Sequence, residues 1–231
     1  LYTAILTTAE YGVADLMTTT VNLITPFFTL IIAEAVMRFA LDKDCDKRQV
    51  LSIGVFVTLI GSACMLLVSP LIKLSSDLAP YYILFVLYYF VTALQSVLSQ
   101  FVKGIEKVTV YASSGVLHTM TFIALNILFL VVLSKGIEGY LLSMVLSNAI
   151  TICYLIVGAK LWEYIISPKS VSRDLTQKML KYSVPMIPNS LSWWISNSSD
   201  KYMLTFFCGV AATGVYSVSQ RIPSLFATIS T

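Results

Sequence analysis

Short polar breaks divide this sequence into long apolar runs. The runs lie near residues 13–40, 50–72, 81–102, 109–133, 140–162 and 180–207, and a further one begins near residue 214. About 20 apolar residues cross a bilayer as an α-helix, whereas a strand of a membrane barrel needs only about 10. The length of the runs therefore predicts an all-α integral membrane protein that crosses the bilayer several times.

The composition excludes a soluble globular domain. The chain is 57% hydrophobic and 12% charged, whereas soluble domains carry about 25% charged residues. Its formal net charge of +3 is small, and we expect no nucleic-acid partner. The four cysteines have neither the spacing of metal ligands nor that of a disulfide framework. We expect no metal site and no cofactor.

Basic residues concentrate in alternate breaks between the apolar runs. Two of the basic residues, Lys73 and Lys135, lie in one set of breaks. The other set holds eleven: Arg38, Lys43, Lys47, Arg48, Lys103, Lys107, Lys160, Lys169, Arg173, Lys178 and Lys181. Because cytoplasmic loops are enriched in Lys and Arg, we expect the second set of breaks to face the cytoplasm.

The longest break, near residues 163–181, divides the chain into two membrane units. Residues 1–6 look like the tail of an earlier helix, so we expect the sequence to be an internal piece of a longer protein. The predicted parts are a first transmembrane lobe over residues 1–162, a cytoplasmic linker over 163–179 and the start of a second lobe over 180–231.

Two local signals describe the passage from the linker into the second lobe. Asp174 with Gln177 resembles a capping box, which favours a short amphipathic helix on the membrane surface; a solvated linker is the alternative. Pro185 and Pro188 interrupt the helical hydrogen-bond ladder, which predicts a kink or hinge near the start of the next span.

A short internal repeat supports the second lobe. The octapeptide AEYGVADL at residues 9–16 is echoed by ATGVYSVS at residues 212–219, in the same kind of turn six predicted helices later. Repeats of six helices in the same sense are a known plan of transporters.

Two apolar runs carry polar side chains at helical spacing. One polar face holds Asp15, Thr18, Asn22, Thr25 and Thr29, and the other is formed by Asn189, Ser192, Ser196 and Asp200 with Asn197 and Ser199 at its edges. A charge at bilayer depth costs roughly 2.5–3.5 kcal/mol or more, so these faces meet protein or water. Hydrogen bonds between helices are one reading. We favour a shared polar cavity lined by Asp15, Thr18, Asn22, Thr25, Asn189, Ser192, Ser196, Asn197 and Asp200. The least polar run, 50–72, is expected to face lipid.

The remaining charged residues allow alternative roles. Glu34 and Arg38 have the spacing of a local ion pair; Arg38 as a phosphate contact is the other reading. Lys201 and Arg221 either attract phosphate or extend to the membrane interface.

Three titratable residues are candidates for binding a coupling ion. They are Asp200, Asp15 and His118, the only histidine of the chain. For His118, a hydrogen-bonded position inside the bundle is the alternative.

Two segments carry a family resemblance. LTTAEYGVADLMTTTVNLITPFFTLIIAEAVMRFALD (residues 6–42) resembles the opening hairpin of O-antigen repeat-unit flippases of the polysaccharide transporter family. YSVPMIPNSLSWWISNSSDKYMLTFFCGVAATGVYSVSQRIPSL (residues 182–225) is similar to helices seven and eight of the same family.

The resemblance implies a fold in the multidrug/oligosaccharidyl-lipid/polysaccharide exporter superfamily, in which two six-helix lobes face a central cavity. On that reading the chain is a fragment: the first six-helix lobe plus the first two helices of the second.

The same resemblance implies a function. Relatives move undecaprenyl-pyrophosphate-linked oligosaccharide across the bacterial inner membrane by alternating access, for O-antigen or other surface polysaccharide. The expected partners are that lipid-linked oligosaccharide, membrane lipid, other polysaccharide-assembly proteins, and a coupling proton or sodium ion.

Two other functions remain as alternatives. A cation-coupled drug exporter or other small-molecule exporter has the same fold. A membrane-embedded polysaccharide-processing enzyme needs acid/base residues or a metal cluster in substantial loops. The breaks here are short, the single histidine lies inside an apolar run, and no metal-ligand cluster is present in the sequence, so we do not expect an enzyme.

Overall fold

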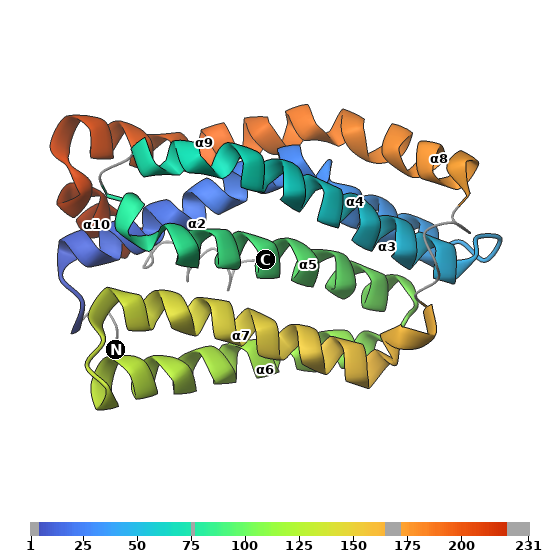
Figure 1. Ribbon diagram of the computed structural model, residues 1–231, viewed down its shortest axis with the longest axis horizontal. Coiled ribbons are helices and arrows are strands. Elements are labelled where there is room, and N and C mark those ends of the chain that lie inside the picture. The colour runs from blue at the N-terminus through green and yellow to red at the C-terminus, as the bar shows by residue number, and fades with distance from the viewer. Residues whose placement is uncertain (1–4, 75–76, 165–171, 221–231) are drawn as a thin grey trace.

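A computed structural model describes residues 5–74, 77–164 and 172–220, and within these ranges the chain is helical and forms no strand. Most helices lie side by side along the long axis of the molecule (Figure 1). In chain order the elements are α2 (Thr8–Thr29), α3 (Ile32–Leu41), α4 (Lys47–Val68), η1 (Ser69–Leu74), η2 (Ala79–Tyr81), α5 (Tyr82–Gly104), α6 (Val108–Asn126), η3 (Ile127–Val132), α7 (Gly136–Ala159), η4 (Leu161–Tyr164), α8 (Arg173–Ser183), η6 (Val184–Met186), α9 (Ile187–Cys208) and α10 (Val210–Ser219).

Four helical segments are long and apolar enough to cross a membrane, and α2 with α3 forms a fifth if that bent pair is one span. The four are Lys47–Ile72, Ala79–Gly104, Val108–Val132 and Gly136–Ala159. The prediction of an all-α membrane protein is confirmed. The 22-residue helix α9 is long enough to cross, but its serines, asparagines and adjacent charges make it less apolar than these spans.

The first predicted span, 13–40, is wrong as a single straight helix. The axes of α2 and α3 differ by 61°, because Leu30 and Ile31 both adopt left-handed backbone conformations with φ of 52°. Pro26 already removes one hydrogen bond from the last turns of α2. Gly61 of α4 packs against the Phe28 carbonyl just before the bend, and any side chain there would collide with it.

Helix α2 also begins earlier than the apolar run suggests. The Thr7 hydroxyl accepts a hydrogen bond from the Glu10 amide at 3.2 Å, and the Glu10 carboxylate accepts one from the Thr7 amide at 2.9 Å. This reciprocal capping box satisfies two amides that the first turn leaves free. The segment TTAEYG is therefore mostly helical and is not a break.

The linker helix α8 has a different cap from the predicted one. Ser172 is the N-cap, since its hydroxyl accepts from the Leu175 amide; Asp174 lies in the first turn and pairs with Lys178 at 2.6 Å. Residues 165–171 of the predicted linker lie outside the described residues.

The two prolines after α8 do not break the helix that follows them. Pro185 lies in the short element η6, and Pro188 lies in the first turn of α9, where the missing amide hydrogen has no helical partner to lose. The expected kink is thus a 3₁₀ turn that joins α8 to α9, and α9 itself runs unbroken to Cys208.

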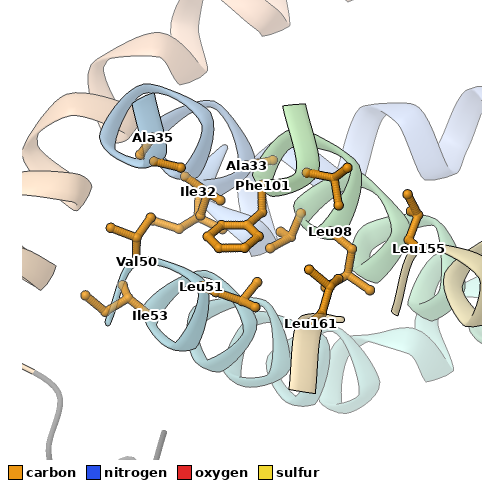
Figure 2. Packing of buried hydrophobic residues seen from close by; sticks show 14 of the residues in the cluster. Ile32, Ala33, Ala35, Val50, Leu51, Ile53, Leu98, Phe101, Leu155 and Leu161 are labelled. Atoms are coloured by element: carbon orange, nitrogen blue, oxygen red, sulfur yellow. The ribbon is translucent and has the colours of Figure 1, made fainter. Parts of the chain in front are cut away.

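The largest apolar core joins α3, α4, α5 and α7. Phe101 is fully buried and lies among Ile32, Leu51 and Leu98 (Figure 2). The buried Met179 attaches α8 to the same core. A second core, around Met17, Phe85, Tyr89 and Leu141, joins α2 to α5 and α7.

The segment predicted to face lipid, residues 50–72, exposes Phe56, Leu59 and Leu67, but it is also the most buried of the four candidate spans. Half of the most apolar part of Lys47–Ile72 is buried inside the molecule, whereas only 11% of the corresponding part of Val108–Val132, which contains α6, is buried. Small residues explain the difference: Gly54 and Gly61 let α4 approach Val36 and Phe28 closely. The most exposed of the four candidate spans is Val108–Val132. Its helix α6 lies on the opposite side of the bundle from α8 and α9 (Figure 1).

Candidate functional site

The two octapeptides of the internal repeat pack against each other where α10 crosses the start of α2. At Gly12, an added Cβ would collide with the Val210 carbonyl; at Gly214, it would collide with the Thr8 carbonyl and lie 3.1 Å from the Gly12 amide nitrogen. Gly12 and Gly214 occupy equivalent positions of EYGVADL and ATGVYSV. We call the contact of α2 with α9 and α10 the seam, and this crossing is its Gly12 end.

Next to the glycines, an ion pair joins α2 to α9. Lys201 Nζ lies 2.8 Å from Asp15 Oδ2, and the two side chains are only 15% and 14% exposed. The Ser217 hydroxyl of α10 donates to the same carboxylate oxygen at 2.7 Å. Asp15 therefore binds one residue of α9 and one of α10. Burial weakens competition from water, so breaking such a pair is costly.

The neighbouring Asp200 is held within α9 and α10. Its carboxylate accepts hydrogen bonds from the Tyr216 hydroxyl, from Gln220 Nε2 at 3.5 Å and from the Lys201 amide at 2.9 Å. All of these donors are neutral. In the part of the chain that the structure describes, Asp200 has no cationic partner within 4 Å, so its charge is balanced less directly than that of Asp15.

Two further contacts extend the seam along α2 and α9, which run antiparallel. The Thr20 and Tyr202 hydroxyls lie 2.5 Å apart. The Trp194 indole donates to the Thr19 carbonyl at 3.1 Å, and the Trp194 and Tyr202 rings lie 5.5 Å apart. These aromatic side chains fill the middle of the seam.

The other end of the seam, near Pro188, has a different character. Asn22 of α2 and Asn189, Ser192, Ser196 and Asn197 of α9 are exposed. Two of them bond only to their own helix: Ser192 donates to the Pro188 carbonyl at 2.9 Å and Asn197 to the Trp193 carbonyl at 2.7 Å. Thr18 and Thr25 are half-buried and likewise donate to carbonyls of α2. We call this the Pro188 end.

The predicted cavity residues thus fall into two groups. Asp15 and Asp200 lie in the packed Gly12 end, and the exposed residues lie toward the Pro188 end. Among the cavities described below, none is lined by these side chains.

Arg38 is exposed on α3 and faces the linker helix. Its guanidinium lies 5.1 Å from the centre of the Tyr182 ring of α8, and both residues line a cavity of about 530 Å³ together with Glu34 and Asp42. The expected Glu34–Arg38 ion pair is wrong, because Glu34 instead accepts a hydrogen bond from Gln100 Nε2 at 3.0 Å. The packing of α3 against α5 provides that nearer partner.

His118 lies apart from the seam on α6, which packs mainly on α7. Its Nε2 is 3.4 Å from the Ser147 hydroxyl, and its ring is stacked with Phe122. It lines a cavity of about 240 Å³ between α5, α6 and α7, with Tyr88, Tyr140 and Asn148.

The predicted phosphate contact of Arg221 stays a prediction. Arg221 lies outside the described residues. Across residues 5–74, 77–164 and 172–220, no three His, Cys, Asp or Glu side chains come together as a metal site would require.

Sequence reasoning missed the residues that tie the seam together: Thr20, Trp194, Tyr202, Tyr216 and Ser217. One signal was available. Aligning the octapeptides on Gly12 and Gly214 places Ser217 at the position equivalent to Asp15, and these two residues bond to each other. The pairing of Asp15 with Lys201 had no such signal, because it depends on how α9 is rotated against α2.

A family model described as "Polysaccharide biosynthesis protein" matches residues 1–229. No curated protein and no solved structure matches the chain.

Proposed function

Because the chain belongs to the polysaccharide biosynthesis protein family, we propose that it is part of a flippase for lipid-linked oligosaccharide. The cargo would be an undecaprenyl-pyrophosphate-linked repeat unit of O-antigen or another surface polysaccharide. The membrane would be the bacterial inner membrane, and the mechanism alternating access between two lobes.

The chemistry of such a cargo explains why membrane helices would carry polar faces. A sugar headgroup with a pyrophosphate cannot cross about 30 Å of hydrocarbon unaided, whereas a polyprenyl tail is soluble there. A polar cleft that is open sideways lets the head pass while the tail stays in lipid. Hydroxyl and amide groups suit this path, because they exchange hydrogen bonds with sugars at little cost.

The observation that carries the proposal is the polar side of α9. This side of the helix has an exposed row, which continues into the half-buried Asp200–Lys201 region; the row consists of Asn189, Ser192, Ser196 and Asn197. In a two-lobe transporter such a row would border the cleft between the lobes. The distribution of basic residues places its Pro188 end toward the cytoplasm, the side on which the lipid-linked units are made.

We assign the charged residues of this path as follows. Arg38 would meet the pyrophosphate near the cytoplasmic surface, and Lys201, with Arg221 as a further candidate, deeper in the membrane. Asp200 is the first candidate for a coupling proton or sodium ion, since its described partners are neutral donors. Asp15 and His118 are the other candidates.

The test is transport by the full-length protein in liposomes that contain a fluorescent lipid-linked oligosaccharide. Protein-dependent movement between leaflets is expected. In cells that lack the gene, Asp200→Ala should restore surface polysaccharide poorly at normal expression. Asp174→Ala is the matched control, because Asp174 pairs on the exposed surface of α8. Failure of the native protein to move the lipid would refute the flippase.

A drug exporter of the same superfamily is the second candidate. The observation in its favour is the hydrogen bond between the Tyr216 hydroxyl and Asp200, because a carboxylate beside an aromatic ring suits an organic cation. Protein-dependent export of a cationic dye, with no movement of the lipid-linked oligosaccharide, would favour it over the flippase.

A further inference from the structure

The ion pair at the Gly12 end occupies the only basic residue within the described part of α9. Lys201 is held by Asp15 at 2.8 Å, and in the described part of the chain its ammonium has no second partner. An ammonium group offers three N–H donors. Lys201 is therefore a cation inside the membrane bundle whose present partner is a carboxylate of a different helix.

The position of the pair makes it a contact between the two predicted lobes. Asp15 lies about two turns into α2, and Lys201 lies about two turns before the end of α9. Ser217 of α10 bonds to the same oxygen of Asp15. If Asp15 lost Lys201, the Ser217 bond and the two contacts made by Thr20 and Thr19 would still join α2 to the other two helices.

Beside the ion pair, α2 and α10 cross closely, and the contacts at Gly12 and Gly214 are made by backbone atoms. Neither Gly12 nor Gly214 contributes a side chain, so polar side-chain contacts between α2 and α10 come from neighbouring residues such as Asp15 and Ser217. A buried ion pair supplies such a contact and can be exchanged for another anion, since a phosphate oxygen and a carboxylate oxygen are equivalent acceptors for an ammonium.

From these contacts, and resting on the proposed function, we infer that Lys201 is an anion site that Asp15 occupies while the Gly12 end is closed. A phosphate-type anion of the cargo replaces Asp15 on Lys201, and loss of the Asp15 contact releases α2 from α9 and α10. Binding of the cargo and opening of the Gly12 end are then one exchange of partners.

The test measures closure of the Gly12 end directly. In full-length protein with Cys45, Cys64, Cys153 and Cys208 replaced by serine, Thr8→Cys and Val215→Cys place two exposed thiols across the glycine crossing. The rate of their cross-linking by a short reagent is followed in liposomes of zwitterionic lipid. Added sodium pyrophosphate should slow the rate about fivefold to tenfold, as for a typical coupling between sites.

Substitutions of the pair should change the same rate. Lys201→Gln and Asp15→Asn should each slow cross-linking without ligand, and Lys201→Gln should remove the response to pyrophosphate. The exchange Asp15→Lys with Lys201→Asp should restore the fast rate. Asp174→Asn and Lys178→Gln remove the exposed ion pair of α8 and should change nothing.

The inference is overturned if the single substitutions cross-link at the native rate, or if pyrophosphate slows Lys201→Gln as much as the parent. The assignment of the anion to the cargo is overturned if anionic phospholipid in the liposomes slows cross-linking and pyrophosphate does not, because the anion at Lys201 is then a headgroup of the surrounding membrane. The pyrophosphate titration of the parent needs no change at the pair and so survives misfolding of a variant. Intact exchange without transport of lipid-linked oligosaccharide would instead refute the proposed function.

Discussion

At the Gly12 end of the seam, Asp15, Lys201 and Ser217 satisfy one another across three helices. About three turns of α9 away, near Pro188, Asn189 and Ser192 are exposed, and no described hydrogen bond joins them to α2. Both ends carry strongly polar side chains in a membrane protein. At one end they hold helices together, and at the other they remain available.

This difference shows that polar side chains in a membrane helix can have two roles, one in holding helices together and one in binding a ligand. Paired polar groups are structural, because separating them leaves a buried charge or donor without a partner. Unpaired and exposed ones contribute little to stability and can be given to a ligand. The predictions below test whether the two ends differ in this way, from the largest expected effect to the smallest.

Gly214→Leu should have the largest effect. The new side chain would collide with the Thr8 carbonyl, so α10 must move away from α2, at a cost of about 3 kcal/mol or more. We expect loss of transport and a lower thermal midpoint in detergent. Gly115→Leu is the control, since no atom lies within 4 Å of its added Cβ. Equal behaviour of the two variants would show that the crossing is not tight.

Lys201→Met should follow. It leaves the largely buried Asp15 carboxylate without its cation, which we expect to lower the free energy of unfolding by about 2–3 kcal/mol, less than for a fully buried pair. Adding Asp15→Asn should recover most of the loss. Denaturation of the single and double variants measures this, and a double variant that is less stable than Lys201→Met would contradict the pairing.

Tyr202→Phe should cost about 1 kcal/mol, the usual value of one hydrogen bond, because it removes the contact with Thr20. Tyr154→Phe is a matched control: it removes a similar bond to Ser113, which joins α6 to α7 away from the seam. Both variants should lose similar stability. Only Tyr202→Phe should slow cross-linking in the reporter protein that carries Thr8→Cys and Val215→Cys.

Asn189→Ala should change stability least, by no more than about 0.5 kcal/mol, because its side chain is exposed and bonds to no other helix in the described structure. If the Pro188 end forms part of the path, movement of lipid-linked oligosaccharide should nevertheless fall severalfold. Thermal unfolding and liposome transport measure the two quantities separately. A large loss of stability would show that this end is structural as well.

The helical membrane class could be predicted because it depends on run length and composition, which are properties of the sequence alone. The bend at Leu30–Ile31 could not, since both residues are ordinary apolar residues and only tertiary packing holds them in left-handed conformations. The cap at Thr7 was predictable: TTAE has the pattern of a capping box. The burial of α4 depended on its glycines meeting partners and not on its low polarity.

The candidate site divides in the same way. Helical spacing identifies which residues share a face, so the polar rows of α2 and α9 could be predicted. It gives no rotation of one helix against another, and so it could not pair Lys201 with Asp15 or Glu34 with Gln100. The Glu34–Gln100 contact follows from the packing of α3 against α5 around Phe101, and the Lys201–Asp15 contact follows from the crossing of α2 with α10 at Gly12 and Gly214.

The meeting of Gly12 with Gly214 has a consequence for ancestry. Equivalent positions of a repeat that touch each other make the kind of self-complementary contact found on the twofold axis of a homodimer. Duplication and fusion of a chain that dimerised through this glycine would leave such a contact. Aspartate at both equivalent positions would place two carboxylates against each other; Ser217 avoids that repulsion and leaves the single carboxylate of Asp15 to Lys201.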